Sequence, residues 1–187
     1  MYWNPDISKK YNFYSISSDG RVMNWNLMKN KLEPEEVIRL KLIGRNNEDE
    51  SSLIGLASGL CFDFNKFDPN IFILGTEEGK ILIIGRIHKC SKSYSGQYQE
   101  TYQGHLLAVY KVRWNNFHPR TFISASADWT VKIWDSKIVT PILSFDLAMA
   151  VVDAVWAPYS STVFATTTLD KVYIYDLNVD KHSKLSE

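Results

Sequence analysis

Several features that define other protein classes are scarce or missing in these 187 residues. Two cysteines, Cys61 and Cys90, are too few for a disulfide framework, which indicates a reducing compartment. No apolar run approaches the roughly 20 residues of a membrane-spanning helix, and the N-terminus lacks the basic start and apolar stretch of a signal peptide. Basic and acidic residues number 21 each, so no net charge would attract nucleic acid or an anionic membrane. These absences predict a soluble, intracellular protein that binds neither nucleic acid nor an anionic membrane.

Motifs for small ligands are missing as well. The four histidines and two cysteines show no metal-ligand spacing. No glycine-rich segment leads into Gly-Lys-Ser/Thr and a helix, as a phosphate-binding loop does. We therefore expect no metal, no cofactor and no small-molecule substrate.

The sequence does contain a repeat. An acid recurs at separations of 59, 50 and 42 residues, with a phenylalanine six positions and a hydroxyl two positions before it. The acids are Asp19, Glu78, Asp128 and Asp170, the phenylalanines are Phe13, Phe72, Phe122 and Phe164, and the hydroxyl residues are Ser17, Thr76, Ser126 and Thr168. The last three units add Phe64, Trp114 and Trp156 fourteen positions before the acid, and Phe67, Phe117 and Tyr159 three positions after these. The separations fit a repeat of roughly 40–45 residues with variable loops.

Each unit is predicted to form strands, because its apolar residues alternate and helical signals are nearly absent. The predicted strands of the last two units are 99–103, 109–114, 121–126, 130–134, 142–145, 151–156, 162–168 and 172–175. Residues 33–42 alternate too and predict the outer strand of the first sheet, whereas 46–52 predict a solvated loop. The recurring acid falls at the turn between the second and third strands, where Asp side chains bond nearby backbone amides.

The third unit resembles the WD repeat, with QGH at 103–105 and SADWTVKIWD at 126–135. The resemblance implies a hydrogen-bonded network of a histidine, a strand hydroxyl, the turn acid and a tryptophan. Placed on this sequence, these are His105, Ser126, Asp128 and Trp134, with Ser124 as the second choice for the hydroxyl. The other units depart from the pattern, so the full network is expected in one blade only.

A second resemblance extends along the whole chain. The segments FYSISSDGRVMNWNL, GTEEGKI, KCSKSYS, SADWTVKIWD and WAPYSSTVFA are similar, in this order, to the propeller of outer-arm axonemal dynein intermediate chains. One departure is the insertion of LIIGRIH at 82–88, for which the alternatives are a longer third strand, a bulge in that blade or faulty gene processing. The resemblance implies a ring of about seven blades, of which this chain supplies about three and a half.

The fold class that follows is all-β, a partial WD40 propeller. Its expected parts are an incomplete first blade at 1–42, a second blade at 53–103, a third at 108–146, a fourth at 151–176 without its outer strand, and a polar tail at 177–187. A chain of this extent is expected to be a fragment or a partial gene product.

An enzymatic hypothesis rests on His105, Ser126 and Asp128, the residue types of a hydrolase triad. It is disfavoured because Ser126 lies within a strand, without the exposed nucleophile elbow that such a serine needs. Trp3, Trp114 and Trp156 are interpreted as core residues. Trp129, directly after the turn acid, is expected near a blade rim, either as a partner contact or as a partly buried packing residue.

The resemblance therefore implies a non-catalytic scaffold in an axonemal dynein motor, located in the cytoplasm, the cytoskeleton and the ciliary axoneme. Its implied partners are the dynein heavy chain and a second intermediate chain, with the doublet microtubule contacted indirectly. The alternatives are a cytoplasmic dynein intermediate chain in cargo transport and an unrelated WD-repeat adaptor.

Overall fold

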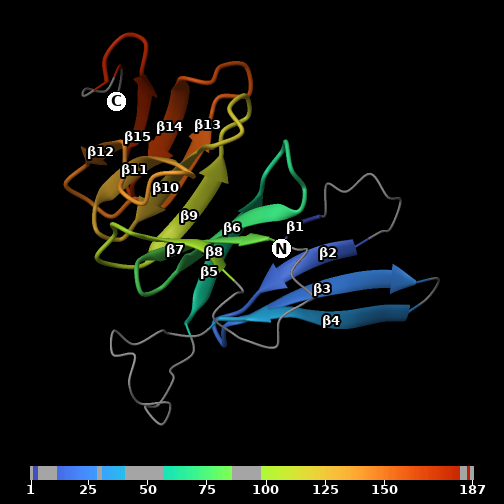
Figure 1. Cartoon of the computed structure of the whole chain (residues 1–187). Coiled ribbons are helices and arrows are strands. Elements are labelled where there is room, and N and C mark those ends of the chain that lie inside the picture. The colour runs from blue at the N-terminus through green and yellow to red at the C-terminus, as the bar shows by residue number, and fades with distance from the viewer. Residues whose placement is uncertain are drawn as a thin grey trace. The chain divides into compact units, whose positions relative to one another are not determined.

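The computed structural model describes residues 2–3, 12–28, 31–40, 57–85, 98–181 and 185 (Figure 1). All regular structure in these ranges is β-strand, arranged in four sheets, which confirms the all-β prediction. No helix in the described ranges could cross a membrane. The chain divides into two compact units, Met1–Gly59 and Leu60–Glu187, and each is described by itself below.

The four sheets follow one another along the chain, and strands that are consecutive in sequence are neighbours in each sheet. The first contains β1 (Tyr2–Trp3), β2 (Asn12–Ile16), β3 (Arg21–Met28) and β4 (Lys31–Arg39). The second contains β5 (Gly59–Phe64), β6 (Ile71–Thr76), β7 (Lys80–Gly85) and β8 (Tyr98–Gln103). The third contains β9 (Val109–Trp114), β10 (Thr121–Ser126), β11 (Thr130–Asp135) and β12 (Leu143–Asp146). The fourth has three strands, β13 (Asp153–Trp156), β14 (Val163–Thr167) and β15 (Val172–Asp176). The predicted strands agree with these bounds to within three residues, and two of them, 109–114 and 121–126, match without any difference.

The phenylalanine that precedes each turn acid has the same place in all four sheets. In each sheet it lies on the second strand and pairs with the equivalent residue of the third strand. The pairs are Phe13 with Trp25, Phe72 with Ile84, Phe122 with Trp134 and Phe164 with Tyr175. In three pairs the rings stack, with centroids 6.0, 6.0 and 4.9 Å apart in chain order. The repeat seen in the sequence is therefore a repeat of sheet geometry.

Within Leu60–Glu187, the aliphatic face of one sheet packs against the aromatic face of the next. One cluster joins Cys61, Ile73, Ile81 and Ile83 to Trp114, Phe122 and Trp134. The other joins Ile123, Ala125, Val131 and Ile133 to Trp156, Phe164 and Tyr175. Burial of each large apolar side chain contributes roughly 1.5–3 kcal/mol. Trp114 and Trp156 are each 3% exposed, as expected of core residues, whereas the side chain of Trp3 lies outside the described residues.

Polar contacts between the first strands of these sheets also repeat. Arg113 of β9 pairs with Asp63 of β5 at 3.2 Å, and Lys111 of β9 pairs with Asp153 of β13 at 3.1 Å. In the loops that follow β5 and β9, an asparagine amide donates to a carbonyl of the next sheet, Asn65 to Pro119 and Asn115 to Ser161, both at 2.8 Å. Sheet-to-sheet spacing is thus set by apolar packing inside and by paired polar groups at the loops.

The insertion at 82–88 begins inside β7. Residues 82–84 pair with β8, and the pairing shifts register between Ile83 and Ile84. The extra residue of this bulge lies on β8, because Ile83 pairs with Glu100 and Ile84 pairs with Tyr98. Residues 86–88 of the insertion lie outside the described residues, as do Cys90 and the predicted loop at 46–52.

Candidate functional site

A chain of buried hydrogen bonds spans the third sheet. The Trp134 Nε1–H donates to Ser124 Oγ at 2.8 Å, and Ser124 Oγ lies 2.6 Å from His105 Nε2. His105 Nδ1 lies 2.9 Å from Asp128 Oδ2. The tryptophan can only donate and the carboxylate can only accept. With a neutral imidazole, the Ser124 hydroxyl donates to His105 Nε2 and His105 Nδ1–H donates to Asp128.

The serine in this network is Ser124, so the assignment of Ser126 was wrong. Ser126 Oγ donates to the Leu107 carbonyl at 3.1 Å and accepts from the Asp128 amide at 3.2 Å. Both serines are fully buried, and positions two apart on a strand share one face. Ser124 is the one within reach of the Trp134 indole. His105, Asp128 and Trp134 belong to one hydrogen-bonded network, as the WD resemblance implies, and Ser124 connects Trp134 to His105.

Asp128 binds two loops at once. Its Oδ2 accepts the Leu106 amide at 3.1 Å, and its Oδ1 accepts the Thr130 amide at 3.1 Å and the Thr130 hydroxyl at 2.6 Å. Burial acts to raise the pKa of this carboxyl, but the hydrogen bonds from His105 and Thr130 outweigh it and hold the pKa below its usual value. The charged carboxylate therefore fixes the loop before β9 to the turn after β10.

The other turn acids lie at the same place but have different partners. Asp19 accepts the Arg21 amide at 3.2 Å, and hydrogen bonds from Arg21 lower its pKa to about 2. Glu78 is exposed in the β6–β7 turn, and Asp170 accepts the Thr168 hydroxyl at 2.9 Å. The first sheet also has a tryptophan–serine bond, since Trp25 Nε1 donates to Ser15 at 2.8 Å. Within the described ranges, the chain from tryptophan through serine and histidine to the acid is complete in the third sheet alone.

The turns and loops around this network form one continuous edge of unit Leu60–Glu187, here called the acid-turn edge. It comprises the turns 77–79, 127–129 and 168–170 and the loops 104–108 and 147–152. Backbone bonds join its parts: Ala127 donates to Ala108 at 2.9 Å, Leu147 to Trp129 at 3.0 Å, and Val152 to Thr167 at 2.8 Å. Gly79 lies so close to the next loop that a Cβ added to it would be 2.6 Å from the His105 carbonyl oxygen.

Apolar side chains project from this edge into solvent. Leu106 is 87% exposed, Leu169 is 80% exposed and Trp129 is 53% exposed. Three of the exposed residues beside them are acidic: Glu77, Glu78 and Asp170. An exposed group of large apolar residues of this kind is typical of a protein-binding surface.

Trp129 also adopts a backbone conformation that bulky residues seldom adopt. Its φ is 73°, in the left-handed region. The residues at the same place in the first and second sheets are Gly20 and Gly79, with φ of 78° and 81°. Glycine tolerates this conformation because it has no Cβ. A tryptophan held there by its turn, and half exposed, is strained in a way that is typical of functional positions. Trp129 lies at the β10–β11 turn, as expected of a rim residue, and is 53% exposed; its role as a partner contact stays a prediction.

Sequence reasoning ranked Ser124 second to Ser126 and did not identify Leu106 or Leu169. A signal for Ser124 was present, since Ser15 precedes Trp25 by ten residues, as Ser124 precedes Trp134. The two leucines show no pattern along the chain that marks them as exposed. The described residues include no group of three or more side chains able to hold a metal ion.

Comparison with protein families now defines the class. The model of the WD domain, G-beta repeat, matches residues 96–135, which include all four network residues. With four sheets of consecutive strands, the chain is a WD-repeat protein whose sheets form part of a propeller.

Relatives narrow this class. The chain is 50% identical over 186 residues to dynein intermediate chain 2, ciliary, of Heliocidaris crassispina, covering 97% of this chain and 26% of that protein. It is 48% identical over 144 residues to the rat dynein axonemal intermediate chain 1, covering 76% and 20%. It is 42% identical over 192 residues to the 78 kDa flagellar outer arm dynein intermediate chain of Chlamydomonas reinhardtii, covering 97% and 27%. The chain thus belongs to the family of axonemal dynein intermediate chains, and it spans 20–27% of the length of these three relatives.

Proposed function

We propose that this chain is part of a non-catalytic scaffold subunit of an outer-arm axonemal dynein. The support is its similarity, over 97% of its length, to proteins named as ciliary and flagellar outer arm intermediate chains. On this proposal the subunit acts in the axoneme of cilia. It contacts the dynein heavy chain and a second intermediate chain, and reaches the doublet microtubule through them.

The acid-turn edge is the proposed surface for the heavy chain. Trp129, Leu106 and Leu169 supply apolar area, and large aromatic residues at the centre of an interface often dominate its energy. The buried network supports this surface, because Asp128 ties the loop that presents Leu106 to the turn that presents Trp129. The edge is acidic around its apolar centre, which favours a partner segment with basic residues beside apolar ones.

The geometry argues against the hydrolase hypothesis in particular. The serine that contacts His105 is Ser124, which is 0% exposed. A nucleophilic serine has to reach a substrate carbonyl, and a fully enclosed hydroxyl cannot. Ser126, the serine of the hydrolase hypothesis, contacts backbone groups instead of His105.

The test replaces Trp129 with glycine, the residue found at the same place in the first two sheets. Trp129→Gly relieves the strain of the left-handed backbone and removes the proposed contact. A loss of binding by this variant is therefore not caused by a loss of folding. The tagged chain and its variants are incubated with ciliary extract, and the bound dynein is identified by mass spectrometry. The matched control is Val179→Gly, which alters a residue that is 68% exposed and lies outside the acid-turn edge.

We expect wild type and Val179→Gly to recover axonemal heavy chain, and Trp129→Gly to recover about tenfold less. Recovery of cytoplasmic heavy chain in place of the axonemal one would move the chain to the cargo-transport alternative. Equal recovery of heavy chain by the wild type and both variants would show that Trp129 is not part of the interface.

A further inference from the structure

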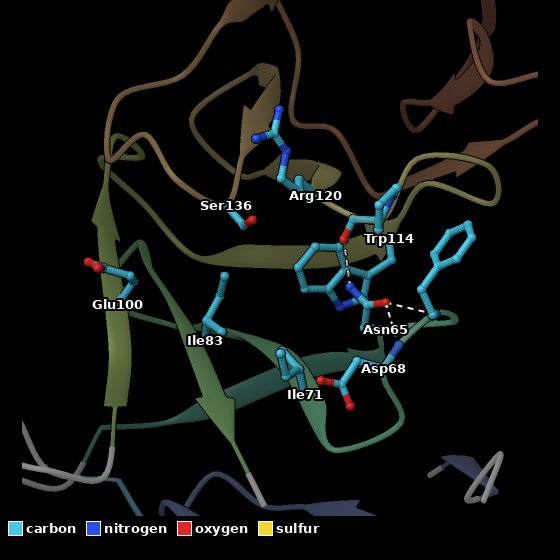
Figure 2. Close-up of a pocket in the computed structure, with 10 residues that line it drawn as sticks. Asn65, Asp68, Ile71, Ile83, Glu100, Trp114, Arg120 and Ser136 are labelled. Atoms are coloured by element: carbon cyan, nitrogen blue, oxygen red, sulfur yellow. Dashed lines mark hydrogen bonds between the residues drawn. The ribbon is translucent and has the colours of Figure 1, made fainter.

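The two junctions between sheets in unit Leu60–Glu187 are built alike. Where the second sheet meets the third, and where the third meets the fourth, aliphatic side chains of one sheet pack on aromatic side chains of the next. Figure 2 shows the cavity at the first of these junctions, with Ile71 and Ile83 of the second sheet and Trp114 of the third in its wall. The repetition defines two kinds of face that fit together, one aliphatic and one aromatic.

The aliphatic face of the fourth sheet is exposed. Val131 and Ile133 on the third strand of the third sheet are 0% and 3% exposed. The residues at the same places in the fourth sheet are Val172 and Ile174, which are 53% and 40% exposed. Val155, also exposed, lies in one row with Ile174, because β14 pairs with both β13 and β15 at this level. The fourth sheet therefore presents to solvent the apolar face that the third sheet buries.

The aromatic face of the first sheet is only partly covered. The rings at the second-strand and third-strand positions of the third sheet are fully buried, whereas Phe13 and Trp25 at the same places are partly exposed. Leu27 lies two residues after Trp25 and is 50% exposed. The equivalent residue of the fourth sheet, Leu177, packs against the cluster between the third and fourth sheets. The first sheet thus carries the aromatic kind of face, with more of it in solvent.

We propose that this chain associates head to tail with a second copy of itself. The aliphatic face of the fourth sheet in one copy packs on the aromatic face of the first sheet in the other. Each copy carries one face of each kind, so the contact is heterologous, made by two different surfaces. Exposed apolar faces are typical of sites where proteins associate. The contact between copies then has the composition of the two junctions within the chain.

Contacts between two faces of the same kind fit less well. At both junctions within the chain, the rings of one sheet fill the space beside the smaller aliphatic side chains of the next. Protein interiors are close-packed, so two aliphatic faces would leave voids and two aromatic faces would be overpacked. The head-to-tail contact does not depend on the proposed heavy-chain surface, because both faces lie on strands outside the acid-turn edge.

The first test is sedimentation velocity of the 187-residue chain over a range of concentrations. We expect dimers or longer head-to-tail assemblies, at multiples of the 21.6 kDa chain mass. Ile174→Lys and Leu27→Lys each place a charge on one face, at a side chain that is already exposed, so the fold is retained. Each variant should weaken association about tenfold or more, because an unpaired charge is costly to bury. Leu106→Lys, which changes an 87% exposed residue outside both faces, should associate as the wild type does.

Mixing the two variants tests which faces meet. Ile174→Lys keeps an intact first-sheet face and Leu27→Lys keeps an intact fourth-sheet face, so the mixture should form a dimer through one intact junction and grow no further. Val172→Lys repeats the fourth-sheet change at a second exposed position, and circular dichroism checks that each variant is folded. The proposal is overturned if the wild type stays monomeric at every concentration, if Leu27→Lys or both fourth-sheet variants associate as the wild type does, or if the mixture contains no dimer.

Discussion

Replacing Ser124 with alanine tests the buried network most sharply, because the change removes one oxygen and leaves two partners behind. Trp134 Nε1–H loses its acceptor and His105 Nε2 loses its donor. Each buried group left unpaired costs about 1–3 kcal/mol, so Ser124→Ala should lower the free energy of unfolding by about 3 kcal/mol. Ser126→Ala is the matched control, since it is equally buried but loses bonds to backbone groups of adjoining loops, worth about 1 kcal/mol.

The assay is urea unfolding followed by tryptophan fluorescence. With a slope of about 2 kcal/mol/M, the predicted difference of about 2 kcal/mol moves the midpoint of Ser124→Ala about 1 M below that of Ser126→Ala. Ser15→Ala removes the acceptor of Trp25 in the first sheet, where no histidine joins the described network, and should cost about 1 kcal/mol. A larger loss for Ser126→Ala than for Ser124→Ala would refute the assignment of Ser124.

Three other predictions follow from the same contacts. The pKa of Asp128 is lower in the folded chain than in the unfolded chain. The charged Asp128 carboxylate therefore stabilises the fold above about pH 4, and this stabilisation is lost as the pH falls toward the folded pKa. In Asp128→Asn the melting temperature should fall less between about pH 4 and pH 2 than it does in the wild type. Burial raises the pKa of Cys61 to about 12, so in a Cys90→Ser background its labelling by a thiol reagent at pH 8 should proceed only through unfolding, and fast labelling of the native chain would contradict this. Trp156→Phe should lower stability by about 1 kcal/mol more than Trp114→Phe, since of these two N–H groups only that of Trp156 has an acceptor among the residues that the structure describes, and equal losses in urea unfolding would contradict this.

The repeat made most of the fold predictable. Phe13, Phe72, Phe122 and Phe164 marked the second strand of each sheet, and the turn acids marked the hairpins that follow. Alternation then gave the strand ranges to within a few residues. These features are local, because a strand's period and a turn's residues depend on short stretches of chain.

The site was less predictable because its geometry depends on contacts between distant residues. Ser124 and Ser126 share a strand face, so alternation could not choose between them, and the position of the Trp134 indole decided it. The left-handed turn at Trp129 could have been inferred from Gly20 and Gly79 at the same place. The spacing between two packed sheets could not be inferred, because it depends on side chains that are distant in the sequence.

The most direct test of the scaffold account is photo-crosslinking from the acid-turn edge within an assembled outer-arm dynein. Benzoylphenylalanine replaces Trp129 in one preparation and Val179, which is 68% exposed outside that edge, in another. The account predicts crosslinks to the dynein heavy chain from position 129 and few or none from position 179. Heavy-chain crosslinks from position 179 alone, or none from either position, would contradict it.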